Sequence, residues 1–120
     1  MSPSSTSTDQ PLTIDVERRP DAVIVRLRGA ADMEACPRLR DELLALASEQ
    51  FPQIILDLAG MTFICSIGLG DIVAAHSRCR HHDGVIKLVS PEPHVADVLE
   101  KTKLTRLFRV FETVEQALTG

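Results

Sequence analysis

Two kinds of hydrophobic pattern alternate along this chain. Residues 12–17 alternate apolar and polar side chains, which is the period-two pattern of a half-buried strand. Residues 22–28 are apolar on both faces and follow a short turn at 18–21, so the two segments predict an antiparallel hairpin. Residues 53–58 and 85–89 are nearly continuous apolar runs, which are typical of interior strands covered on both faces.

Helical spacing separates these predicted strands. Cys36, Leu39, Leu43 and Leu46 recur at the spacing of one helix face. A second amphipathic segment follows the strand at 53–58. Its expected buried stripe is Ile67, Ile72, Val73, Ala75 and Cys79. Strand, helix and strand in this order form a βαβ unit, in which the two strands are parallel and the crossover is right-handed.

The last third of the chain predicts three further elements. Val95, Val98 and Leu99 supply the apolar face of a third helix. Residues 107–111 are expected to form a short edge strand, and residues 113–118 a last helix that opens with capping-box spacing. The predicted fold class is therefore α/β, a single domain with a mixed sheet of four or five strands and about four packed helices.

Length and charge narrow the possible classes of protein. The 120 residues are enough for one domain with a substantial core. Residues 1–11 are rich in Ser and Thr and nearly free of large apolar groups, so we expect a disordered tail there and the folded domain at 12–119. A net charge of −4 argues against nucleic-acid binding through a broad basic surface.

Cysteine usage and hydropathy bear on location. The three cysteines are scattered and odd in number, which disfavours a disulfide framework and favours a reducing compartment. The chain shows no secretory signal pattern and no apolar run near the roughly 20 residues of a membrane span. We therefore expect a cytoplasmic protein without stable membrane insertion.

Residues 63–70 are the most chemically distinctive segment. They are expected to form a loop that ends by opening the second helix. Ser66 is a good candidate for the helix N-cap, because its hydroxyl can accept a hydrogen bond from a first-turn amide. Gly68 and Gly70 allow another backbone to approach closely. Free amides and the positive end of a helix dipole suit an anion such as a phosphate.

Other reactive side chains have less specific patterns. His76, Cys79, His81 and His82 cluster near the end of the second helix, but favourable interaction with the helix dipole explains the histidines more simply than a metal does. Cys65 precedes a helix start, where a thiol can become reactive, although a free Cys is more often a small buried hydrophobe. No nucleotide-binding loop or spaced carboxylate pair is present, so we expect neither an enzyme nor a cofactor.

Residues 56–70, LDLAGMTFICSIGLG, resemble the central motif of STAS domains, the anti-sigma factor antagonists of bacterial partner switching. That motif places Asp-Ser-Ser-Gly or Asp-Ser-Thr-Gly at the helix start, and a partner kinase phosphorylates the second hydroxyl residue. Here the Asp position holds Cys65, the first Ser position holds Ser66, and the acceptor position holds Ile67. Gly29 and Asp32 match a second family motif, Gly-Glu-Leu-Asp.

The resemblance implies a non-catalytic anti-sigma factor antagonist that binds an anti-sigma factor/serine kinase of the GHKL ATPase type. Because Ile67 cannot be phosphorylated, the protein would stay binding-competent or would have lost partner switching. Ser66, one position early, is the alternative phosphorylation site. The implied partner-binding residues are Asp32, Thr62, Cys65, Ser66, Ile67, Gly68, Leu69, Gly70, Asp71, Ala74 and Arg78. Asp32 could also simply accept backbone hydrogen bonds at the next helix start.

Two other functions remain open at this stage. Related STAS domains act as scaffolds or ligand-responsive subunits, for example attached to transporters, without a kinase switch. A thiol-based sensor at Cys65 is a third hypothesis. The family also usually ends its third helix with Thr-Gly-Leu, so Lys103 in the Gly position predicts local strain or a different helix cap. The sequence leaves the oligomeric state of the protein open.

Overall fold

The computed structural model describes residues 10–120, and these form a five-stranded mixed sheet with strand order β1-β2-β3-β4-β5. The first two strands form the predicted antiparallel hairpin, and the other neighbours pair in parallel. This arrangement confirms the predicted fold class. The strands are β1 (Thr13–Arg19), β2 (Ala22–Ala31), β3 (Gln53–Ile64), β4 (Val85–Val89) and β5 (Val110–Phe111).

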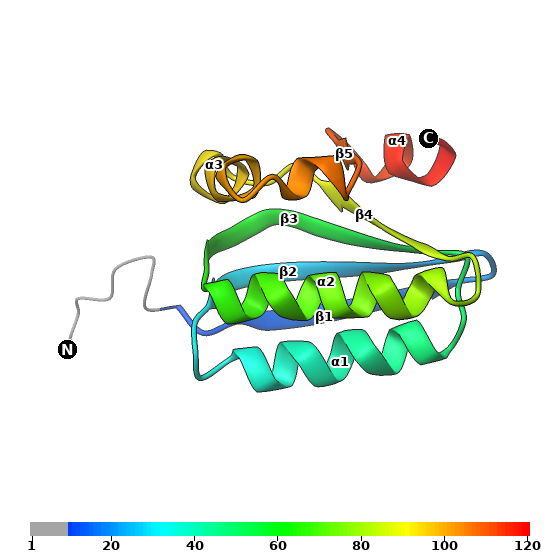
Figure 1. Ribbon diagram of the computed structural model, residues 1–120, viewed down its shortest axis with the longest axis horizontal. Coiled ribbons are helices and arrows are strands. Elements are labelled where there is room, and N and C mark those ends of the chain that lie inside the picture. The colour runs from blue at the N-terminus through cyan, green and yellow to red at the C-terminus, as the bar shows by residue number, and fades with distance from the viewer. Residues whose placement is uncertain (1–9) are drawn as a thin grey trace.

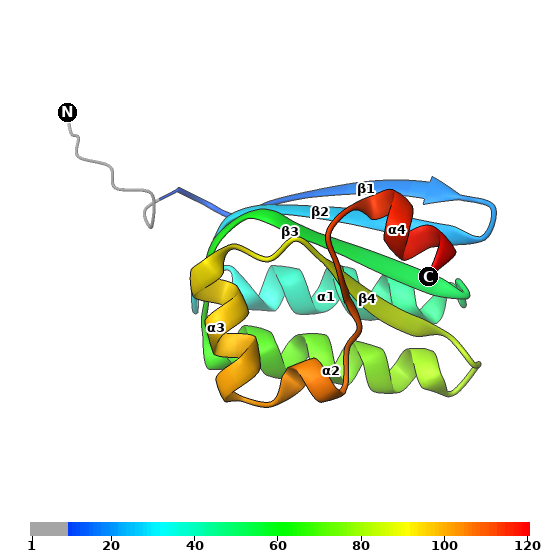
Figure 2. The ribbon, with the colours of Figure 1, turned by 90° about the horizontal axis from the view of Figure 1, so that it is seen from above.

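The helices cover the two faces of the sheet unequally. Long helices α1 and α2 lie side by side on one face, and the short α4 lies on the other (Figures 1 and 2). The main core fills the layer under α1 and α2, and a smaller cluster around Ile24, Ile55 and Ala117 lies under α4. The helices are α1 (Cys36–Ser48), α2 (Ser66–Arg80), α3 (Pro93–Lys101) and α4 (Val114–Thr119), with one turn of 3-10 helix at Leu104–Arg106. Within residues 10–120, no helix combines the length and hydrophobicity that a membrane crossing requires.

Two segments that the sequence predicts as turn and loop are strand instead. β2 continues through the expected turn at 29–32 as far as Ala31, and β3 continues through the expected loop as far as Ile64. The parallel ladder between them persists, with Gly29 opposite Met61 and Ala31 opposite Ile64. Small residues and glycine suggest a turn locally, but ladder pairing with a distant strand decides the conformation.

Gly29 makes the long β2 possible. Its φ is +89°, a backbone conformation that L side chains rarely adopt, and it adjoins a register shift in the ladder. A Cβ at this position would overlap the carbonyl of Pro11. Ala30 donates its amide to the carbonyl of Gln10 at 3.1 Å, so the segment entering β1 lies against β2. Residues 1–9 of the predicted tail lie outside the described residues.

The C-terminal third follows its predicted order, with shorter elements. β5 consists of Val110 and Phe111 alone, because Phe108 turns into the core instead of extending the strand. Lys103 adopts a left-handed conformation with φ of 63°, which confirms the expected strain. Thr113 caps α4 by accepting the amide of Gln116 at 3.1 Å, as its capping-box spacing predicts.

Candidate functional site

The candidate site lies where the parallel strands β2 and β3 end and the helices α1 and α2 begin. Both strands end at the same edge because they are parallel, and Figure 1 shows both helix starts at that end of the sheet. Ligands of open α/β sheets commonly bind at the carboxyl ends of parallel strands. The sheet therefore brings the segments around Asp32 and Ser66 together, although about thirty residues separate them in the sequence.

The start of α2 differs from its prediction by one residue. Cys65, not Ser66, is the N-cap, with φ of −83° and ψ of 167°, and its carbonyl accepts the amide of Leu69 at 3.1 Å. The Cys65 amide donates to the carbonyl of Ala31 at 3.0 Å, which holds this residue in the extended conformation of the strand ladder. Ser66 is consequently the first helical residue, and within the described residues 10–120 no side chain caps this helix start. The first-turn amides of α2 are thus left open to an incoming acceptor.

The burial of Ile67 is also different from the prediction. Its side chain is 49% exposed, whereas Leu69 takes the expected place in the core. The reason is helical phase: Ile67 lies five residues before Ile72, which places the two on different faces, whereas Leu69 lies three residues before it. An isoleucine in the first turn of α2 therefore faces solvent.

The other predicted site residues divide by exposure. Gly68 is buried with Leu69, so neither offers a side-chain surface, and an added Cβ at Gly68 would press on Ile64. The residues that are exposed are Asp32, Ser66, Ile67, Gly70, Ala74 and Arg78, and those that are partly buried are Thr62, Cys65 and Asp71. Ile67, Gly70, Ala74 and Arg78 follow one another at steps of three or four, so they form one exposed face of α2.

Asp32 organises the connection between β2 and α1. Its Oδ1 accepts the amides of Glu34 at 3.1 Å and of Ala35 at 3.0 Å, which confirms the backbone hydrogen bonds expected of it. The neighbouring Met33 is 68% exposed and was missed by the sequence analysis. The sequence feature that could have identified it is a large apolar side chain between two acidic residues, Asp32 and Glu34. Met33 and Ile67 give this end of the molecule two exposed apolar side chains.

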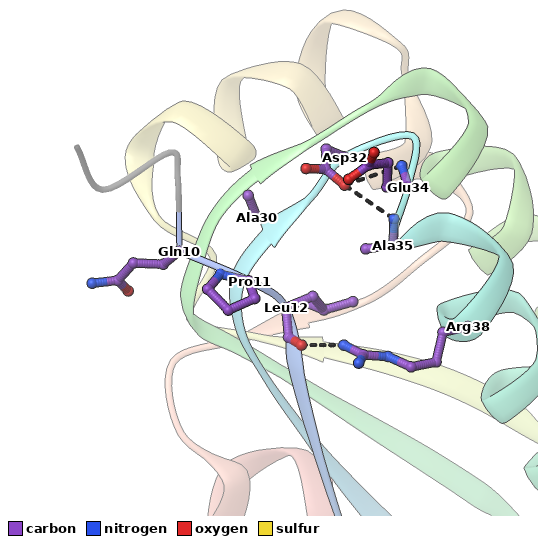
Figure 3. A pocket seen from close by; sticks show the side chains of 8 residues that line it. All are labelled: Gln10, Pro11, Leu12, Ala30, Asp32, Glu34, Ala35 and Arg38. Atoms are coloured by element: carbon purple, nitrogen blue, oxygen red, sulfur yellow. Dashed lines mark hydrogen bonds between the residues drawn. The ribbon is translucent and has the colours of Figure 1, made fainter. Parts of the chain in front are cut away.

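A cavity of about 280 Å³ adjoins Asp32 (Figure 3). The guanidinium of Arg38 closes one side by donating to the carbonyl of Leu12. The residues lining the cavity are Gln10, Pro11, Leu12, Ala30, Asp32, Glu34, Ala35 and Arg38. Two carboxylates and one guanidinium therefore extend the charged part of the site from Asp32 towards β1.

Two thiols meet between the helix starts. The Sγ atoms of Cys36 and Cys65 are 3.0 Å apart, and both residues are free cysteines. Burial raises the pKa of the Cys36 thiol to about 12, with further contributions from Cys65, Asp71 and Asp32. No spacing in the sequence predicts this pairing, because only the β2–β3 register brings the two residues together. Asp71 acts on Cys36 electrostatically, and its buried Oδ2 has no hydrogen-bond partner among the described residues.

The histidine and cysteine cluster near the end of α2 is dispersed in the fold. His76 and Cys79 face the core, whereas His81 is exposed. Across residues 10–120, no group of three or more His, Cys, Asp or Glu side chains is arranged to hold a metal ion. His76 Nδ1 instead accepts the amide of Ile86 at 3.2 Å, so this histidine is part of the packing between α2 and β4.

Two known proteins resemble this chain over nearly its whole length. The chain is 27% identical over 109 residues to the anti-sigma F factor antagonist of Paenibacillus polymyxa, covering 90% of this chain and 93% of that protein. The crystal structure of an anti-sigma factor antagonist from Mycobacterium paratuberculosis superposes with a TM-score of 0.83 at 26% identity, covering 91% of this chain and 92% of that one.

A more distant likeness concerns a transporter. The mouse solute carrier 26 family member A9 anion transporter matches with a TM-score of 0.71 at 17% identity, covering 86% of this chain but 18% of the transporter chain. At that identity the likeness shows a shared fold. The family that matches the sequence is described as STAS domain, and the match spans residues 13–117, nearly all of the described part. This chain therefore belongs to the STAS domain family.

Proposed function

We propose that this chain is a non-catalytic anti-sigma factor antagonist that acts in the cytoplasm by binding an anti-sigma factor/serine kinase of the GHKL ATPase type. The observation that carries the proposal is Ile67, an exposed apolar residue in the first turn of α2 at the position of the family's phosphoacceptor. The relatives from Paenibacillus polymyxa and Mycobacterium paratuberculosis are both named anti-sigma factor antagonists, and each is matched over nearly its whole length.

The exposed face of α2 is the proposed contact surface. It combines one large apolar side chain, Ile67, with the small residues Gly70 and Ala74 and the cation Arg78. Small residues let a partner backbone approach the helix, and a central apolar anchor surrounded by polar groups is the usual arrangement of binding energy at an interface. Exposed Met33 and Asp32 extend this surface across the start of α1.

Isoleucine at position 67 changes how the proposed complex is regulated. A phosphorylated hydroxyl in the first turn of a helix is stabilised by the open amides and the helix dipole, and its charge of nearly −2 would disrupt an apolar contact. Ile67 has no hydroxyl, so this switch is absent and binding persists in the presence of ATP. Ser66 is exposed and next in sequence, which makes it the alternative acceptor.

The regulation is tested by incubating the protein with the purified GHKL-type anti-sigma factor kinase encoded nearest to its gene, with Mg²⁺ and ATP. Wild type should bind and keep its mass, whereas Ile67→Ser should gain one phosphoryl group, about 80 Da, and dissociate. Leu107→Ser is a matched control, since Leu107 is 44% exposed and lies outside the proposed surface. A phosphoryl group mapped to Ser66 in wild type would show that the acceptor has moved by one residue.

The surface is tested separately by a bulky substitution. Ala74→Arg on the exposed face of α2 should weaken kinase binding at least about tenfold, because the new side chain occupies the approach path at a cost above about 1.4 kcal/mol. Ala45→Arg, an identical change on the exposed side of α1, should bind like wild type. Equal affinity for both variants would place the interface elsewhere, and absence of binding by wild type would reject this partner class.

A second function is favoured by the likeness to the solute carrier 26 transporter. The chain would then be a STAS scaffold or ligand-responsive subunit without a kinase switch. Affinity purification of the tagged protein from its own cells separates the two functions. Recovery with a transporter subunit supports the scaffold, whereas recovery with a GHKL-type kinase supports the antagonist.

A further inference from the structure

The pairing of Cys36 and Cys65 is a product of the sheet. The two residues are 29 positions apart in the sequence, and each follows a strand that ends at the same edge. The carbonyl of Ala31, the last residue of β2, accepts the amide of Cys65 at 3.0 Å and the thiol of Cys36 at 3.8 Å. One backbone carbonyl thus holds both residues at the helix starts, with their sulfur atoms 3.0 Å apart.

We propose that Cys36 and Cys65 are a reversible dithiol–disulfide site, oxidised by a hydroperoxide, that joins the start of α1 to the start of α2. The proposal rests on the position of the two sulfur atoms and is independent of the proposed function. The sulfur atoms are 3.0 Å apart, so a disulfide bond requires them to move only about 1 Å closer.

The oxidation proceeds in two balanced steps. The Cys65 thiolate attacks one oxygen of hydrogen peroxide, the O–O bond breaks, and the departing hydroxide takes up a proton to become water. Cys65 is then a sulfenic acid, oxidised by two electrons. Cys36 sulfur attacks Cys65 sulfur, the S–O bond breaks, and the leaving hydroxide takes the Cys36 proton. Two thiols and one peroxide therefore yield one disulfide and two waters.

The surroundings assign the two roles. Cys65 is partly exposed and lies at the amino end of α2, so peroxide can reach it and it is the attacking residue. Cys36 is buried, which shields it from peroxide and makes it the resolving residue. Burial, followed by the contact with Cys65, raises the pKa of the Cys36 thiol, so Cys36 is the poorer attacking group.

Cys79 provides an internal control. It is buried on the core side of α2, and burial raises the pKa of its thiol. Cys79 lies 14 residues after Cys65, near the C-terminal end of α2, whereas Cys65 is the N-cap at the other end of that helix. The proposal therefore predicts that peroxide leaves Cys79 unmodified while it joins Cys36 to Cys65.

The test is oxidation of the full chain with hydrogen peroxide, followed by intact-mass analysis and non-reducing peptide mapping. Wild type and Cys79→Ser should both lose two hydrogens, about 2 Da, and yield a peptide joining Cys36 to Cys65, and dithiothreitol should reverse the change. Cys36→Ser should instead accumulate a sulfenic acid at Cys65, which dimedone traps. Circular dichroism of each variant reports whether it folds.

Three results would overturn the proposal. One is a wild-type chain whose Cys65 is oxidised to sulfinic acid while Cys36 stays a thiol. Another is a disulfide that includes Cys79 or joins two chains. The third is a wild-type chain that stays reduced at peroxide concentrations that oxidise an exposed cysteine peptide. Wild-type mapping alone decides among these, so the conclusion stands even where Cys36→Ser fails to fold.

Discussion

His76 makes a specific prediction about stability and pH. It lies on α2 with 5% of its side chain exposed, and its Nδ1 accepts the amide of Ile86 at 3.2 Å. β5 pairs with Leu88 and Val89 of β4. Among residues 10–120, no strand pairs with the outer edge of β4 at Ile86, and the imidazole takes that place. The ring also packs edge-on against Phe108, with 4.9 Å between ring centroids. The fold therefore requires a neutral His76 with Nδ1 unprotonated.

Protonation of His76 should destabilise the fold. Burial lowers the pKa of His76, and the charge of Arg80 lowers it further; Lys87 and Arg109 line the same cavity of about 340 Å³. In the unfolded chain, a histidine side chain has a pKa of about 6.5. A lowered native pKa means that this stabilisation is complete above about pH 6.5 and is lost as the pH falls towards the native pKa. With one proton involved, the slope reaches at most about 1.4 kcal/mol per pH unit.

The assay is urea unfolding of wild type and His76→Asn between pH 8 and pH 5. Asn places Oδ1 near the position of Nδ1, so it can accept the Ile86 amide but does not titrate. The difference in free energy of unfolding between wild type and His76→Asn should shrink as the pH falls below about 6.5. His94→Asn, an exposed histidine, should keep the wild-type pH dependence. Parallel curves for wild type and His76→Asn, or an advantage that grows on acidification, would refute the reasoning.

Two residues with positive φ, Gly29 and Lys103, and the side-chain cap Thr113 give further predictions, each measured by the urea midpoint. Gly29→Ala should lower stability by about 2 kcal/mol or more, since φ is +89° and the new Cβ meets the Pro11 carbonyl; an unchanged midpoint would contradict the long β2. Lys103→Gly should raise stability by up to about 1 kcal/mol by relieving the left-handed φ of 63°, and a loss would argue against that strain. Thr113→Ala should cost about 1 kcal/mol by removing the α4 cap. Thr113→Ser, which keeps the hydroxyl, should retain most of that stability.

The order and type of the elements could be predicted because their periodicity is local. The alternation at 12–17 and the helical stripe from Cys36 to Leu46 each lie within one element, and both are confirmed. The ends of β2 and β3 could not be predicted from local sequence. Residues 29–31 have the composition of a turn, and they become strand only through pairing with residues 61–64. Ser66 was misplaced for a related reason: the amide of Cys65 pairs with Ala31, Cys65 is the N-cap, and the helix begins one residue earlier than predicted.

The same distinction separates what could be predicted of the site. The hydrogen bonds of Asp32 are local and were expected. The contact between Cys36 and Cys65 depends on the register of two strands, and no spacing in the sequence encodes it. Met33 stood out only as a large apolar side chain in a short polar connection, and it was missed because a single residue forms no periodic pattern.

The two faces of α2 divide stability from the proposed recognition. Leu69, Ile72 and His76 face the core or β4, whereas Ile67 and Ala74 face solvent. Since the inner residues carry the packing, substitutions on the outer face can change partner contacts while leaving the free energy of unfolding nearly unchanged. The Cys36–Cys65 pair lies at the starts of both helices, with Cys36 as the first residue of α1 and Cys65 as the N-cap of α2. A bond there constrains the start of α2, and with it the backbone that presents Ile67, without altering any residue of the exposed face.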